Sequence, residues 1–384
     1  MVEFNIIHKE FESTKDISGF TQKYSDNRCG IRYLLLRSLD TPHLSELLKV
    51  SISKYEGLLK QAYNSTLTTD AVLSYIESKR QEIDEVRNAA EEGLHDIILN
   101  FGPVNCGLRN DKVDDIVKSL VRDKTIKTIE ELNERIEYIL PRLGNYIRWS
   151  FYNQTTNDLI EHIFIKHPKI IPTLRKIHHI DVFLKIGDSI IPFDLKFTHI
   201  SDDFFDLYSM GLIDAVTGND DYEINSNGKS EIEMIKEYYK NNKKSLKLPN
   251  FGGLSKKEII CILSEVDDPK TQTFVESIYR NRYSLINNIT GELKKLEWWN
   301  YKYQGERLFS NNNRLFLFLA YNNDFEDGRP IKGKLDIIEK NVNAFLDSIT
   351  LEEINTIKYH YDKDPSLVGD YSAFSKSILI RTDK

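Results

Sequence analysis

Two aspartates and a lysine have the residue types and the spacing that metal-dependent hydrolysis requires. Asp181, Asp194 and Lys196 lie on two runs of β-type residues that flank Gly187-Asp188. This pair suits a two-residue hairpin turn, because glycine accepts a positive φ angle. The sequence therefore predicts a β-hairpin that carries both carboxylates and the lysine.

The turn predicts the register of the hairpin. If Ile186 lies opposite Ser189, then Asp181 lies directly opposite Asp194, with Cβ atoms about 4.5–5.5 Å apart and side chains on one face. Strand periodicity adds Lys196 to that face. Opposed carboxylates repel, so we expect a shared proton, the lysine or a cation to compensate them. Mg²⁺ fits best, because it takes oxygen ligands and is held by one or two carboxylates.

The order of these residues resembles the PD-(D/E)XK nuclease superfamily, which includes most type II restriction endonucleases. A predicted helix that carries Glu161 precedes Asp181, and Asp194-Leu195-Lys196 follows. The resemblance implies that Asp181 and Asp194 bind Mg²⁺, that Lys196 assists the attacking water, and that Glu161 completes the metal site. Ile180 stands where the family name has proline, at a position that varies.

The pattern around this hairpin predicts an α/β fold. We expect a mixed central sheet with flanking helices, as in the restriction-endonuclease-like core, and a mostly helical N-terminal region. Arg314–Tyr321 is apolar on both faces, which is typical of a buried strand. The expected parts are a helical region for DNA recognition or dimerisation over residues 1–144, a nuclease core over 145–350, and an extension packed on the core over 351–384.

Basic and aromatic residues beyond the hairpin could contact DNA. The candidates for phosphate contacts are Lys240, Lys243, Lys244, Lys247, Arg280 and Arg282. Such contacts dominate affinity for DNA, although a solvated surface is the alternative interpretation. The aromatic residues Trp298, Trp299, Tyr301 and Tyr303 could stack on an unpaired base or belong to the core.

Three further patterns have weaker chemical interpretations. Asp158, one helical turn before Glu161, could replace it. The histidines His162, His178, His179 and His199 crowd the region without the spacing of a zinc site, which favours hydrogen-bonded support. Gly328–Leu335 matches a phosphate-binding loop, but it lacks the Ser/Thr hydroxyl and contains a proline. We therefore expect no nucleotide cofactor.

Composition limits the remaining classes of protein. A net charge of -7, from 52 Lys+Arg against 59 Asp+Glu in 384 residues, argues against indiscriminate coating of nucleic acid but allows a local basic groove. No stretch approaches the ~18 apolar residues of a membrane span, and the first residues lack the features of a signal peptide. Three distant cysteines exclude a disulfide framework. We expect a cytoplasmic protein.

Together these expectations favour one function. We predict a Mg²⁺-dependent endonuclease that hydrolyses phosphodiester bonds of double-stranded DNA, first of all a type II restriction endonuclease; a homodimer is compatible with the sequence. Alternatives with the same fold are another defence or repair nuclease and a catalytically inactive DNA-binding or assembly protein. A third class is an NTPase that uses the Gly328–Lys334 loop.

Overall fold

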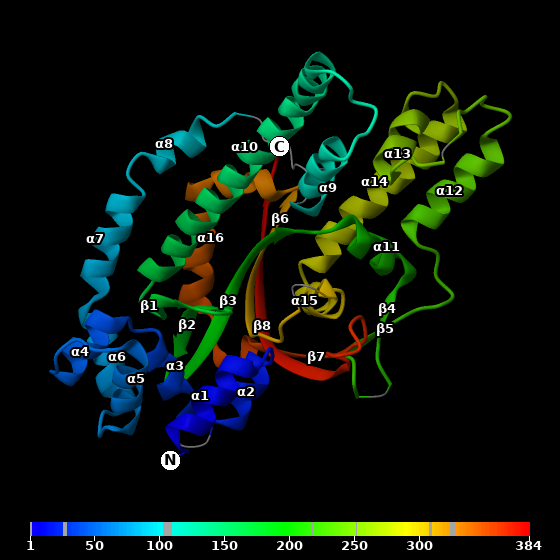
Figure 1. The fold of residues 1–384 in the computed structure, drawn as a ribbon. Coiled ribbons are helices and arrows are strands. Elements are labelled where there is room, and N and C mark those ends of the chain that lie inside the picture. Colours follow the sequence, from blue (N-terminus) through cyan, green and yellow to red (C-terminus); the bar gives the residue numbers. More distant parts are fainter. Residues whose placement is uncertain are drawn as a thin grey trace.

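The centre of the molecule is a six-stranded mixed sheet with the order β1-β2-β3-β6-β8-β7 (Figure 1). The computed structural model describes residues 2–25, 29–102, 110–216, 218–250, 252–306, 309–322 and 327–384. The strands of the sheet are β1 (Ile170–Ile177), β2 (Ile180–Ile186), β3 (Ser189–His199), β6 (Arg314–Tyr321), β7 (Asn355–Tyr361) and β8 (Gly369–Thr382). The first three strands are antiparallel, β3, β6 and β8 run parallel, and β7 is antiparallel to β8. The predicted α/β class and mixed sheet are confirmed.

Helices precede the sheet and fill its connections. The helices before the sheet are α1 (Phe4–Ser13), α2 (Ile17–Lys23), α3 (Cys29–Arg37), α4 (Thr41–Leu48), α5 (Tyr55–Asn64), α6 (Thr69–Ser78), α7 (Arg80–Ala90), α8 (Leu94–Leu99), α9 (Asn110–Val121) and α10 (Ile129–Lys166). The later ones are α11 (Asp202–Met210), α12 (Glu231–Asn242), α13 (Lys256–Ser264), α14 (Pro269–Ile289), α15 (Leu293–Lys302) and α16 (Leu335–Ser348), with the short helices η3 (Arg329–Gly333) and η4 (Leu351–Glu353). A small hairpin, β4 (Leu212–Asp214) and β5 (Tyr222–Ile224), follows α11. Among the described helices, none is both long and apolar enough to cross a membrane.

Helices cover both faces of the sheet. Figure 1 shows α10 and α16 on one side and α15 on the other. Phe193 and Leu315 belong to the buried cluster that contains α10 and α16. Phe316 and Phe318 belong to the cluster around α15. Because β6 contributes to two cores, apolar residues occupy both of its faces, as the sequence predicted.

The N-terminal helices share a core with the sheet. Ile177, Ile180 and Phe183 of β1 and β2 lie in one buried cluster with Tyr33 and Leu59. Helix α10 runs without interruption across residue 144, where the sequence placed a boundary. The N-terminal region is therefore joined to the sheet by a shared core and a continuous helix.

The segment from residue 351 onward is part of the central sheet. It supplies β7 and β8, and β8 pairs with β6 on one side and with β7 on the other. This corrects the expectation of an extension packed on the core, because its strands complete the main-chain hydrogen bonding of β6.

Helices α12, α13 and α14 form a lobe beside the sheet (Figure 1). They have a hydrophobic cluster of their own, which includes Ile235, Tyr239, Ile259 and Val275. This lobe carries the lysines and arginines that were predicted to contact phosphate.

Candidate active site

The hairpin of β2 and β3 has the predicted register. Ile186 pairs with Ser189, and the pairing continues to Val182 and Phe193. Gly187 has a φ angle of 57°, a conformation that costs glycine little. The turn therefore brings the two candidate carboxylates to the same level of neighbouring strands.

The two aspartates lie at a fork in the sheet. The pairing of β2 with β3 ends at Val182 and Phe193, and β3 then pairs with β6, beginning at Asp194 and Arg314. Beyond this point, the edge of β3 that faces β2 has no strand partner among the described residues. Where β2 separates from β3, the side chains of the two strands have room to approach one another.

The side chain of Asp181, from β2, lies at the edge of β3 where the pairing with β2 has ended. Its Oδ2 accepts a hydrogen bond of 2.7 Å from the backbone N–H of Leu195. Burial raises the pKa of Asp181 to about 7, and the neighbouring carboxylates Asp194 and Glu161 add to the effect. The charged form of Asp181 is thus short of positive partners, which is what a cation would supply.

Asp194 is 5% exposed and is surrounded by donors. Its Oδ2 lies 2.9 Å from Lys196 Nζ and 3.8 Å from Arg314 Nε. It also accepts a hydrogen bond of 3.3 Å from Asn312 Nδ2. Burial opposes ionisation, but Lys196 and Arg314 hold the pKa of Asp194 below its usual range. The predicted pair of aspartate and lysine is therefore formed.

Glu161 lies on the Asp181 side of the site. Both residues line a cavity of about 390 Å³, to which Arg87 also contributes. Glu161 Oε1 forms an ion pair of 2.6 Å with Arg87 Nη2. Asp158, the alternative to Glu161, accepts hydrogen bonds from Gln154 and is not one of the residues that line this cavity. The structure thus favours Glu161 over Asp158.

The described residues contain no group of three or more His, Cys, Asp or Glu side chains that could hold a metal ion. The predicted three-carboxylate set of Asp181, Asp194 and Glu161 is therefore not assembled as one cluster. The two aspartates still suit Mg²⁺, which needs only one or two carboxylates and keeps several waters. Asn312 turns its amide nitrogen toward Asp194, and its Oδ1 is buried without a hydrogen-bond partner in the described part of the chain.

Three consecutive asparagines were missed by the sequence interpretation. Asn311, Asn312 and Asn313 are 0–2% exposed and immediately precede β6. Asn313 Nδ2 donates to Pro192 O at 3.1 Å, and Asn311 Nδ2 donates to Asp16 Oδ1 at 2.7 Å. These amides tie β6 to β3 and to the start of α2. The available signal was a run of polar amides directly before an apolar strand.

The histidines act mainly as local support. His178 and His179 form the turn between β1 and β2, with ring centroids 3.6 Å apart. Burial and His178 lower the pKa of His179 to about 4, so its ring is neutral at pH 7. His162 Nδ1 lies 2.7 Å from Glu91 Oε2, which agrees with hydrogen-bonded support.

The residues predicted to contact phosphate divide into two groups. Lys240, Lys244, Lys247 and Arg280 are exposed, and Lys243 is partly exposed and bonds to Asn250. Arg282 is 5% exposed; its Nε donates to Glu231 at 2.9 Å and its Nη2 to Asp202 at 3.0 Å. This corrects the expectation for Arg282, because its guanidinium is committed to the buried Glu231 and to Asp202.

In the loop that resembles a phosphate-binding loop, the lysine side chains bond to other groups of the protein. Gly328–Lys334 contains the short helix η3. Lys332 is buried and donates to Asn153 and Asn157. Lys334 donates to Thr382 and to the carbonyl of Asp383. Since both lysines have protein partners, the loop does not present a free phosphate cradle.

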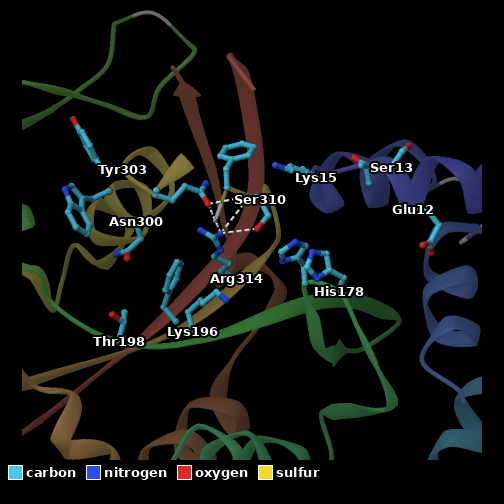
Figure 2. A pocket seen from close by; sticks show the side chains of 17 residues that line it. Glu12, Ser13, Lys15, His178, Lys196, Thr198, Asn300, Tyr303, Ser310 and Arg314 are labelled. Atoms are coloured by element: carbon cyan, nitrogen blue, oxygen red, sulfur yellow. Dashed lines mark hydrogen bonds between the residues drawn. The ribbon is translucent and has the colours of Figure 1, made fainter. Parts of the chain in front are cut away.

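A second cavity, of about 750 Å³, opens on the Lys196 side of the fork. Figure 2 shows Lys196 and Arg314 rising from the sheet, with Asn300 and Tyr303 on one side and Ser13 and Lys15 on the other. We call it the Lys196 cavity. Of the four aromatic residues weighed above, Trp298 and Tyr301 are buried in the core, whereas Trp299 and Tyr303 line this cavity.

Comparison of the chain with protein-family models, with curated proteins and with solved structures found no match. The α/β class therefore rests on the sheet and its helices. The function must be argued from the geometry of the fork.

Proposed function

We propose that this protein is a Mg²⁺-dependent DNA endonuclease that hydrolyses phosphodiester bonds. One observation carries the proposal: Asp181 and Asp194 lie at the point where β2 separates from β3, and Lys196 bonds to Asp194 at 2.9 Å. This is the arrangement that the resemblance to PD-(D/E)XK nucleases predicts.

Each residue of the fork has a role in the proposal. Asp181 and Asp194 would hold Mg²⁺, which lowers the pKa of a bound water and offsets charge on the phosphate. Lys196, whose side chain is 46% exposed, can reach both Asp194 and solvent, so it is placed to orient a water molecule. Asn312 fixes the carboxylate of Asp194 from the buried side.

Among biological roles, a type II restriction endonuclease ranks first. The lobe of α12 to α14 and the N-terminal helices supply surface beyond the sheet for recognition of double-stranded DNA. Another defence or repair nuclease uses the same chemistry. A catalytically inactive DNA-binding or assembly protein is the rival class, and it differs by binding DNA without cutting it. Sedimentation of the DNA complex tests whether two copies act together.

The test is cleavage of supercoiled plasmid and of several defined linear DNAs by purified protein. Wild type should cut in Mg²⁺ and stop in EDTA. Lys196→Ala should lose cleavage, whereas Lys185→Ala, an exposed lysine of the same hairpin, should retain it. Absence of cleavage of every DNA in Mg²⁺ or Mn²⁺ would contradict the proposal, and retained DNA binding would then favour the inactive class.

A further inference from the structure

The Lys196 cavity joins three kinds of side chain that recognise different parts of a nucleotide. Its cations, Lys196 and Arg314, lie on the floor formed by β3 and β6. Its aromatic wall contains Trp299 and Tyr303, whose ring centroids are 6.0 Å apart. Asn300 adds an amide to the same wall. Phosphates are bound by cations, and bases stack on aromatic rings.

Two buried donors in this cavity have no hydrogen-bond partner in the described part of the chain. They are Trp299 Nε1 and Arg314 Nε. Arg314 is 6% exposed, and its Nη2 donates to Gln304 Oε1 at 2.9 Å and to Ser310 O at 3.1 Å. A buried donor without a partner is costly, and Asp194 Oδ2, at 3.8 Å, offsets part of that cost for Arg314 Nε.

A smaller cavity lies between the Lys196 cavity and the Asp181 side of the fork, and it shares lining residues with the cavities on both sides. This cavity, of about 380 Å³, shares His178, Glu12 and Thr14 with the Lys196 cavity, and shares Lys176 with the cavity beside Asp181. Arg175 and Arg37 line this smaller cavity, although Arg37 is paired with Glu12. Arg175 and Lys176 therefore place positive charge between the two sides of the fork.

We propose that the Lys196 cavity receives one unstacked nucleotide of the DNA, next to the phosphate that is cut. The inference rests on the proposed function and names its substrate class: DNA with an unpaired nucleotide, or duplex from which one is extruded. Trp299 and Tyr303 form the surface against which the base packs. Arg314 and Lys196 face its phosphates. The cavity volume lies within the range of roughly 300–1,000 Å³ that small-molecule sites occupy.

The experiment compares two single-stranded oligonucleotides with the same number of phosphates. One is oligo-dT and the other is its abasic analogue, and binding to the full chain is measured by fluorescence anisotropy in EDTA so that no cleavage occurs. Stacking changes affinity by roughly 5- to 150-fold per base, so wild type should bind oligo-dT about tenfold more tightly or better. The combined variant Trp299→Ala/Tyr303→Ala should lose this preference and keep its affinity for the abasic strand.

Two variants separate a specific effect from a loss of folding. Trp299→Phe keeps an aromatic surface and should retain most of the preference. Tyr138→Ala removes a tyrosine that is 73% exposed on α10 and does not line the cavity, so it should behave as wild type. Thermal melting of each variant verifies that it is folded.

Equal binding of both strands by wild type would overturn the inference, whatever the plasmid assay gives. Competition by free dTMP as strong as that by oligo-dT would also overturn it, and would assign the cavity to a free nucleotide. A base preference that depends on Trp299 and Tyr303, in a protein that cuts no DNA, would support the nucleotide site and contradict the nuclease. The failure of one proposal can therefore be distinguished from the failure of the other.

Discussion

Arg87 of α7 forms an ion pair of 2.6 Å with Glu161 of α10, at the rim of the cavity that Asp181 lines. No residue of α7 is fully buried. The helix is held over α10 by this pair, by the contact of Glu91 with His162, and by hydrogen bonds from Arg80 to the carbonyls of Ile165 and Ile170. Glu161 is therefore a structural partner of α7 in addition to being a candidate metal ligand.

The two roles of Glu161 predict different behaviour of matched variants. Arg87→Ala should lower stability by about 1 kcal/mol, because the pair is partly exposed, and should leave the Mg²⁺ requirement unchanged. Glu161→Gln should also raise the Mg²⁺ concentration for half-maximal cleavage. Denaturant unfolding and a Mg²⁺ titration of cleavage measure the two effects. Identical Mg²⁺ curves for both variants would leave Glu161 with the structural role alone.

Asp194→Asn should lose cleavage by about 100-fold or more, because it removes one of two carboxylates for a cation that depends on them. It should also lower stability by about 3 kcal/mol or more, since Lys196 and Arg314 lose a buried anionic partner. Asp188→Asn in the exposed turn of the same hairpin is the control and should change neither quantity. Cleavage and urea unfolding give the answer, and full cleavage by Asp194→Asn would exclude that residue from the mechanism.

The lysines of the α12–α14 lobe should contribute to DNA binding by contacting backbone phosphates. Replacing Lys240, Lys243, Lys244 and Lys247 with Gln should weaken binding to all DNA sequences alike. Each lost phosphate contact should reduce the slope of log affinity against log salt by about 0.9. The check is a salt titration of DNA binding, and an unchanged slope would assign these lysines to a solvated surface.

Arg280 and Arg282 are two residues apart on α14, but replacing them should have different effects on stability. Arg282→Met removes the guanidinium that bonds to Glu231, which is 3% exposed, and leaves Lys256 at 3.2 Å as its remaining cation, so the unfolding free energy should fall by about 2–3 kcal/mol. Arg280→Met should leave stability within about 0.5 kcal/mol, because its side chain is exposed. Chemical denaturation of both variants measures the contrast, and a stable Arg282→Met protein would show that its buried pair is dispensable.

Glu297 should make the protein less stable as pH rises. It is 0% exposed, and burial raises its pKa above the usual value of 4.5, despite hydrogen bonds from Ser377 and Asn355. The folded state thus holds the proton more tightly than the unfolded state, so stability is full below pH 4.5 and declines above it toward the raised pKa. Glu297→Gln should have little effect at pH 4 and should stabilise at pH 8. Thermal melting across this range tests the sign, and an equal shift at both pH values would contradict it.

The elements with local signals could be predicted from the sequence. Gly187 marks the hairpin turn and thereby its register, and the apolar run of β6 has the bounds Arg314–Tyr321 in both the prediction and the structure. Residues 69–99 have helical periodicity throughout, but the structure divides them into α6, α7 and α8, with breaks at Lys79 and before Leu94, where Gly93 has a φ angle of 76°. Local periodicity survives such breaks, so it indicates helix without revealing its ends.

The features that depend on distant partners could not be predicted. The sequence indicates a surface cation at Arg282, because its partner Glu231 lies 51 residues away. Asn312 could not be recognised as part of the site for the same reason, because its partner Asp194 is 118 residues away. Strand β1 was also missed, because its antiparallel partner β2 is what makes Ile170–Ile177 a strand. Tertiary contacts decide all three, and a single sequence does not contain them.

The position of β8 has a consequence for biosynthesis. Strand β6, which borders the fork, needs β8 as its parallel neighbour, and β8 follows every other strand in chain order. A ribosome therefore releases β2, β3 and β6 long before the sheet can close, and such non-local pairing is slow to form. The residues of the fork are therefore translated well before β8, the strand that completes the sheet beside β6, has left the ribosome.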